Sequence, residues 1–163
     1  MAIQIRSYTE QDLPSLMEIW NTVVMESNAF PQNKPFSPEE AKAFFDSQSF
    51  TGVAEEDGEV IGFYILHPNN VGNCGHIANA SYGVKQGIRG KGVGESLVRH
   101  SLKMCGMLGF EGLQFNAVVA TNTAAIHLYE KLGFQWIGTI PGGYRLKDGT
   151  FADIRIYFRP ADR

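Results

Sequence analysis

The sequence predicts an α/β fold in which one mixed sheet is flanked by helices, and three observations carry the prediction. A strand-like run at residues 76–84 leads through a glycine-rich turn into a helix-like run at 93–107. Residues 112–117 are apolar apart from two amide side chains, which is typical of a buried parallel strand. Asp57-Gly58 lies between two strand-like runs and is a strong hairpin signal, so antiparallel strands are expected as well.

The other elements can be assigned in chain order. Asp12 is a plausible N-cap for a first helix, and Ser37-Pro38-Glu39-Glu40 forms a capping box that starts a second one. A further helix follows Asn122. Strands are expected at residues 3–7, 51–55, 59–66, 76–84, 112–117, 134–140 and 151–158. This order predicts a single domain over residues 1–163.

Composition limits the function classes. The formal net charge of −3 argues against a dedicated nucleic-acid binder, whose footprint is normally basic. The sequence has no signal-like N-terminus and no long apolar segment, so we expect a cytoplasmic protein without a membrane partner, with Cys74 and Cys105 reduced. The four histidines lie far apart in the sequence, and no metal site is expected.

The turn between the strand at 76–84 and the following helix is suited to an anion. A strand, a glycine-rich turn and a helix N-terminus aim backbone N–H groups at a phosphate, and Arg89 and Lys91 add two cations. The P-loop pattern fails because Gly92 follows Lys91 where Ser or Thr is needed. The dinucleotide pattern fails because Glu95 stands where its third glycine should be. The sequence therefore predicts a phosphate site of another kind.

Two motifs carry a resemblance to a known family. Arg89-x-x-Gly92-x-Gly94 resembles the pyrophosphate loop of the GNAT N-acetyltransferases. The run from Asn122 to Phe134, ending in Tyr-Glu-Lys-Leu-Gly-Phe, is similar to the asparagine helix of that family. The resemblance covers most of the chain. It implies the GNAT fold, acetyl-CoA as co-substrate and acetyl transfer to an amine.

The resemblance also implies roles for individual residues. Two parallel strands would splay apart around pantetheine, with backbone groups from Tyr82 to Val84 pairing with it and the Val84 N–H facing the oxyanion. Tyr129 would protonate the CoA sulfur, or else would be only an aromatic side chain packed in the groove; Asn122 would contact the cofactor. The pyrophosphate would be held by the loop residues Arg89, Gly90, Lys91, Gly92, Val93 and Gly94, although Arg89 and Lys91 could equally be solvated surface cations.

The residue at the position of the family's general base differs from the family pattern. Many relatives carry Glu near the position of Asn79, and an amide cannot take a proton at neutral pH. A Lys-like amine is neutral in about one part per thousand at pH 7, which costs roughly 4–5 kcal/mol. Either water relays the proton to a remoter group, for which His76 is a candidate, or the enzyme selects the scarce neutral amine.

Residues 76–82, with Asn116 and Asn122, are similar to the fungal acetyltransferases that detoxify L-azetidine-2-carboxylate and related proline analogues. That resemblance implies a catalytic and substrate-binding role for Asn79 and substrate contacts for Asn116 and Tyr82. We expect Asn116 to be a buried strand amide that needs partners, which a bound amino acid would supply. The alternative is that backbone groups satisfy both Asn79 and Asn116, which then only shape the groove.

The resulting hypothesis is an enzyme that acetylates the amine of a small molecule, such as a cyclic or unusual amino acid, in detoxification. A protein or peptide N-acetyltransferase and a non-catalytic acyl-CoA sensor are the alternatives. The loop at 28–36 would border the acceptor site, where Phe30 and Phe36 could line a pocket, although a bland loop is the simpler interpretation. A homodimer is common in the family, and no stretch of the sequence demands one.

Overall fold

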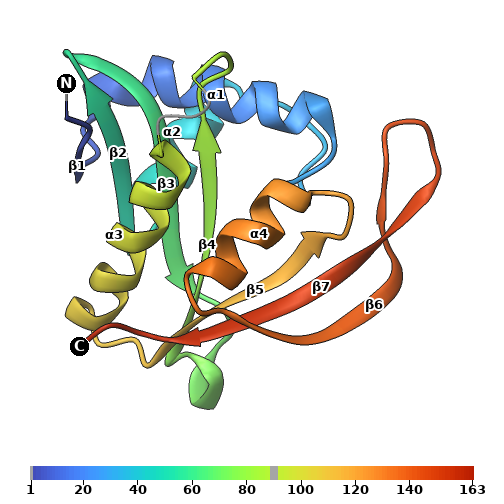
Figure 1. Ribbon diagram of the computed structural model, residues 1–163. Coiled ribbons are helices and arrows are strands. Elements are labelled where there is room, and N and C mark those ends of the chain that lie inside the picture. The colour runs from blue at the N-terminus through green and yellow to red at the C-terminus, as the bar shows by residue number, and fades with distance from the viewer. Residues whose placement is uncertain (1, 89–91) are drawn as a thin grey trace.

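The computed structural model describes residues 2–88 and 92–163, and these residues form a seven-stranded mixed sheet in the order β1-β2-β3-β4-β5-β7-β6 (Figure 1). The strands are β1 (Gln4–Ser7), β2 (Phe50–Glu56), β3 (Glu59–Pro68), β4 (Ile77–Val84), β5 (Gly112–Val119), β6 (Gln135–Arg145) and β7 (Phe151–Pro160). The helices are α1 (Leu13–Glu26), α2 (Pro38–Asp46), α3 (Val93–Met107) and α4 (Thr123–Lys131), with short 3-10 turns at Glu10–Asp12 and Gly72–Cys74.

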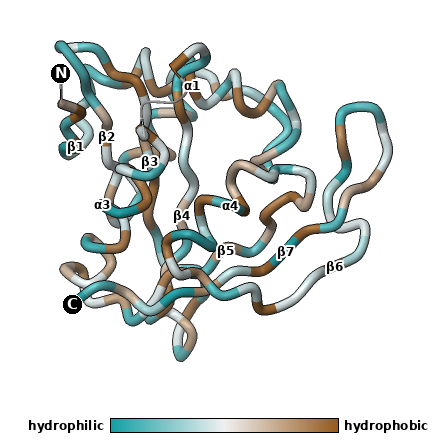
Figure 2. Tube along the Cα trace, in the orientation of Figure 1, coloured by the Kyte–Doolittle hydropathy of each residue, from teal (hydrophilic) through white to brown (hydrophobic). Residues whose placement is uncertain are grey.

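The helices cover both faces of the sheet. Helices α1 and α2 pack on one face through an aromatic core that contains Trp20, Phe45 and Phe63. Helix α3 packs on the other face, where Leu97 and Leu102 meet side chains of β3, β4 and β5. Hydrophobic and hydrophilic residues alternate along α1 and α3, as expected for helices with one buried face (Figure 2).

The predicted mixed α/β class is confirmed, and so are most of the predictions about individual elements. Ser37 accepts from the Glu40 N–H at 3.3 Å and Glu40 accepts from the Ser37 N–H at 3.0 Å, so the capping box is formed. Asp57 and Gly58 both have positive φ, as a tight hairpin turn requires. Strands β5 and β6 run beyond the predicted ends, since their last residues pair with β7.

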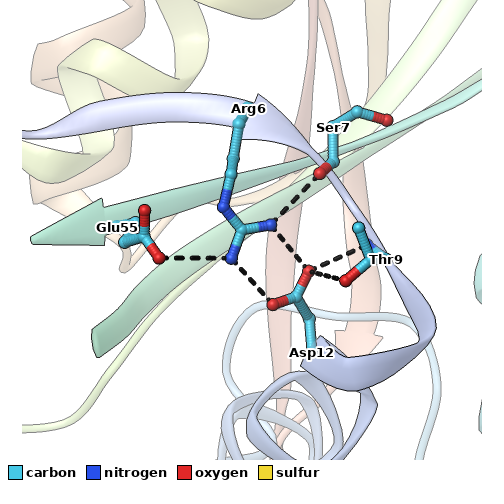
Figure 3. A network of polar contacts seen from close by, with 5 residues as sticks. All are labelled: Arg6, Ser7, Thr9, Asp12 and Glu55. Carbon is cyan, nitrogen blue, oxygen red and sulfur yellow. Dashed lines mark hydrogen bonds and ion pairs between the residues drawn. The ribbon is translucent and has the colours of Figure 1, made fainter. Parts of the chain in front are cut away.

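Asp12 occupies the predicted N-cap position of α1, but its side chain makes no capping hydrogen bond to that helix. Its carboxylate turns back to Arg6, with two hydrogen bonds of 2.8 Å, and also accepts from the Thr9 N–H at 2.8 Å (Figure 3). Arg6 reaches Glu55 of β2 as well, at 3.4 Å. Asp12 is buried, and the hydrogen bonds from Arg6 lower its pKa. The network therefore ties β1 and the start of α1 to β2.

Strands β4 and β5 separate after a short contact. Their parallel pairing covers only Ile77 with Gly112 and Ala78 with Leu113. Beyond that point β4 continues beside β3, while β5 continues beside β7 and bulges between Phe115 and Val118. The separation leaves a gap in the middle of the sheet. Among the described helices the longest has 15 residues, and none is long and apolar enough to cross a bilayer.

Candidate active site

A cavity of about 260 Å³ occupies the gap between β4 and β5. It is bordered by β4, β5, α3, α4 and the loop after α1. Its described lining is Ala29, Phe30, Pro31, Asn79, Ala80, Ser81, Tyr82, Gly94, Val98, Phe115, Asn116, Ala117, Val118, Val119, Asn122, Ala125, Leu128 and Tyr129. These residues include no carboxylate, imidazole or cationic side chain. An adjoining hollow of about 650 Å³ shares part of this lining and reaches the start of α3.

The free edge of β4 faces this gap. The Lys85 N–H donates to Ile61 and the Ile77 carbonyl accepts from Asn69, both at 2.8 Å, so the odd-numbered residues of β4 turn their backbone groups toward β3. Backbone groups alternate sides along a strand, so those of Tyr82 and Val84 point toward β5. The described part of β5 no longer pairs with β4 at that height. Tyr82 and Val84 thus offer unpaired backbone groups to an extended ligand.

Helix α3 begins at this gap. Gly92 precedes the helix with φ of 73°, a conformation that favours glycine, and Val93 is buried under the first turn. A Cβ on Gly94 would meet Leu128 at 3.7 Å, an ordinary contact, so packing within the chain does not require glycine there. A ligand lying against the helix N-terminus would explain it. The other predicted loop residues, Arg89, Gly90 and Lys91, lie outside the described residues.

Glu95 lies in the first turn of α3, where it lines the larger hollow. Its carboxylate accepts from Lys131 of α4 at 2.6 Å and from Arg99 at 2.9 Å. These contacts, that of Lys131 first, lower the pKa of Glu95. The two cations therefore offset a negative charge that would otherwise repel a phosphate at this helix N-terminus.

Helix α4 brings Asn122 and Tyr129 to the same cavity, as the sequence predicts. Asn122 is the N-cap, and its side-chain oxygen accepts from the Ala125 N–H at 3.2 Å. Tyr129 packs against Phe115 with 4.4 Å between ring centroids. Burial raises the pKa of Tyr129, and its hydroxyl has no hydrogen-bond partner among the described residues. The phenol is thus protonated, and it has no structural hydrogen bond to break.

Tyr82 presents its backbone to the gap, but its hydroxyl does not point to an open site. The hydroxyl lies 2.7 Å from the Ser101 oxygen of α3, within the core, and burial raises its pKa well above the ordinary value. Ser101 in turn donates to the Val98 carbonyl at 2.7 Å. Ser101 therefore fixes the Tyr82 ring, and a serine within a helical apolar stripe gave no sequence signal for this role.

The two strand asparagines both line the cavity, but their surroundings differ from the prediction. Asn79 donates to the Gln114 carbonyl of β5 at 2.9 Å and so bridges the two strands where they part. The expectation that Asn116 is buried is wrong, because the β5 bulge leaves it exposed. Its amide donates to Asn69 at 2.7 Å and accepts from Gln114 at 3.0 Å. Asn116 therefore does not need a substrate to satisfy its amide.

The loop after α1 supplies the remaining wall. Phe30 and Pro31 line the cavity, whereas Phe36 stacks on Trp20 with centroids 5.1 Å apart and is absent from the described lining. His76 is exposed and is likewise not part of that lining. Phe36 thus packs on Trp20 and does not line the pocket, whereas Phe30 forms part of the pocket wall.

The model of the acetyltransferase (GNAT) family matches residues 13–134, which is most of the chain. The chain belongs to the acetyltransferase (GNAT) family. It is an acetyl-CoA-dependent N-acetyltransferase.

Three curated relatives show how much of this GNAT chain is similar to known acetyltransferases. N-acetyltransferase aca1 of Schizosaccharomyces pombe is 36% identical over 99 residues, 60% of this chain and 47% of the relative, so this chain spans about half of that protein. Phosphinothricin N-acetyltransferase of Streptomyces coelicolor is 28% identical, with 97% and 96% covered. L-methionine sulfoximine/L-methionine sulfone acetyltransferase of Pseudomonas aeruginosa is 28% identical, with 86% and 85% covered.

Solved GNAT structures share the fold. An N-acetyltransferase from Kribbella flavida superposes with a TM-score of 0.91 at 32% identity, covering 98% of each chain. A phosphinothricin acetyltransferase from Sinorhizobium meliloti, solved in complex with acetyl-CoA, gives a TM-score of 0.91 at 24% identity, with 99% of this chain and 89% of that one covered. The second likeness concerns the fold alone.

Proposed function

We propose that this GNAT enzyme transfers the acetyl group of acetyl-CoA directly to the amine of a small molecule. The observation that carries the proposal is the cavity between the splayed strands, whose lining includes both Tyr129 and the loop after α1. Its volume of about 260 Å³ suits a small acceptor. The cavity continues into the larger hollow, which suits the rest of acetyl-CoA.

The co-substrate would be held by the residues that border this hollow. The free backbone groups of Tyr82 and Val84 suit the amides of pantetheine, and the Val84 N–H suits the oxyanion. The first turn of α3, with Gly92, Val93 and Gly94, suits the pyrophosphate. Asn122 lines both spaces and would contact the pantetheine arm. Arg89, Gly90 and Lys91 are proposed to complete the pyrophosphate site.

The chemistry needs an acid for the leaving sulfur and a neutral amine. Tyr129 is the proposed acid, because it lines the cavity, its phenol is protonated, and its hydroxyl makes no hydrogen bond to another described residue. The amine nitrogen bonds to the acetyl carbon, the carbon–sulfur bond breaks and the sulfur takes the Tyr129 proton. Water receives the amine proton and returns a proton to the Tyr129 phenolate, which restores the enzyme. We propose selection of the neutral amine, which the uncharged lining supports.

The acceptor is proposed to be an amino acid or an analogue of one. Two relatives act, by their names, on phosphinothricin and on methionine sulfoximine or sulfone. In this chain Asn79 and Asn116 place amide groups on the cavity wall, where they can meet a carboxylate or an amine. The resemblance of residues 76–82 to the proline-analogue acetyltransferases leads us to propose a cyclic amino acid such as L-azetidine-2-carboxylate, with detoxification as the role.

The test is thiol release from acetyl-CoA across a panel of acceptors. The panel contains L-azetidine-2-carboxylate, proline, methionine sulfone, methionine sulfoximine, phosphinothricin, polyamines and short peptides. Turnover with the amino acids supports the proposal, and a preference for the cyclic one supports the finer assignment. Turnover only with peptides would overturn the acceptor assignment and leave the co-substrate assignment in place.

We also propose that the enzyme forms a homodimer through β6. This strand lies at the edge of the sheet, and Trp136, Ile137 and Ile140 on it are each about half exposed. An exposed apolar edge strand is a surface that proteins normally cover. Sedimentation analysis of the wild type and of Ile137→Glu tests this: a wild-type dimer that the substitution dissociates supports it, and a wild-type monomer refutes it.

A further inference from the structure

The loop after α1 is joined to the distant β6–β7 hairpin by one side chain. The Tyr144 hydroxyl of β6 donates to the Phe30 carbonyl at 2.6 Å, a contact between residues 114 positions apart. In Figure 1 the β6–β7 hairpin, near the end of the chain, lies on the same side of the molecule as the end of α1, near its start. Phe30 lines the cavity, so the hydrogen bond acts on its wall.

The local structure of β6 brings Tyr144 to this position. The register of β6 against β7 shifts between Ile140 and Tyr144, where two more residues lie on β6 than on β7. Gly142 has φ of 61°, and a Cβ on Gly143 would lie 2.6 Å from Ile154. The bulge thus needs glycine at both positions, and bulges commonly redirect a side chain.

The two other anchors of the loop lie on α1. The Phe36 N–H donates to the Asn21 side chain at 2.9 Å. Trp20 packs on Phe30 with centroids 4.6 Å apart and on Phe36 at 5.1 Å. These contacts hold the ring of Phe30 and the end of the loop, while Tyr144 alone among the described residues holds the Phe30 carbonyl. Pro31 follows directly, so the backbone before it is already restricted.

We propose that Tyr144 is a positioning residue that latches the acceptor wall, so that the hairpin sets the width of the acceptor cavity. Phe30 and Pro31 line the acceptor cavity but not the larger hollow. The latch should therefore affect acceptor binding much more than acetyl-CoA binding. This inference rests on the proposed function for its kinetic consequence, though not for its structural one.

The experiment compares Tyr144→Phe with the wild type and with Tyr8→Phe. Tyr8 donates to Asp46 at 3.1 Å on the surface, so the control removes one tyrosine hydrogen bond away from the cavity. Tyr144→Phe should raise KM for the acceptor by about threefold to tenfold and leave KM for acetyl-CoA within about twofold. Amide hydrogen exchange should quicken within residues 28–36. Tyr8→Phe should change none of these.

Three outcomes would be informative in different ways. Unchanged acceptor KM and unchanged exchange in an active enzyme would overturn the latch. Equal rises in both KM values with a fall in Tm would also overturn it, because they indicate general loosening. A wild type that acetylates nothing in the panel would count against the proposed function instead, and the exchange measurement would still decide whether Tyr144 holds the loop.

Discussion

Replacing Tyr129 with phenylalanine isolates the chemical step. The change removes one hydroxyl that bonds to no described residue, so the fold loses no hydrogen bond and its ring contacts remain. The free energy of unfolding should therefore stay within about 0.5 kcal/mol of the wild type. Positioned acids contribute about 100-fold or more to rate, so kcat should fall at least about 100-fold, or about 2.7 kcal/mol. KM for acetyl-CoA should change little.

The matched control is Tyr157→Phe. Tyr157 lies beside Tyr129, with ring centroids 6.2 Å apart, but its hydroxyl donates to Glu130 at 2.7 Å and accepts from Arg155 at 3.1 Å. This variant should lose about 1 kcal/mol of stability and keep its kcat. The assay is thiol release at saturating acetyl-CoA, together with denaturant unfolding. An unchanged kcat in Tyr129→Phe would refute the acid role.

Three further predictions concern pH, the acceptor and stability. With an uncharged lining, kcat/KM should rise about tenfold per pH unit toward the pKa of the acceptor amine, without a descending limb from Tyr129, whose raised pKa keeps it protonated; a break near pH 6–7 in the rate profile would indicate a protein base. Asn79→Ala removes the bridge to Gln114 and should raise acceptor KM or lower kcat several-fold, whereas unchanged kinetics would leave Asn79 with a shaping role only. Arg6→Ala leaves buried Asp12 without its cation and should cost about 2–3 kcal/mol in urea unfolding. Because the folded pKa of Asp12 is lowered, this stabilisation is present above pH 4 and should fade as the pH drops below about 4; an equal loss at pH 3 and pH 7 would contradict it.

The features that the sequence predicted best depend on a few consecutive residues. The Ser37 capping box and the Asp57-Gly58 turn specify local backbone angles, so they can be recognised without the rest of the chain. The same holds for α3, whose bounds Val93–Met107 match the predicted helix. Asn122 and Tyr129 share one short helix, so their meeting at one cavity also follows from their spacing.

The features that it missed depend on pairing between distant segments. Asp12 takes the predicted N-cap position, but the sequence did not predict that its carboxylate would bind Arg6 through an ion pair with two hydrogen bonds instead of the helix backbone. Asn116 looks like a buried strand residue, but at the bulge of β5 against β7 it is exposed and donates to Asn69. The Tyr144 latch crosses 114 residues.

By itself, then, the sequence determined the mixed α/β class, the glycine-rich helix start and the position of Tyr129, because short runs of residues and the spacing within them indicate each of these features. Only the tertiary structure decided where β4 separates from β5 and that Asn79 of β4 bridges the two strands through the Gln114 carbonyl. It also decided which loop lines the acceptor side of the cavity. Strand register and bulges are set by the packing of whole elements, and that packing carries no signature within any one stretch of the chain.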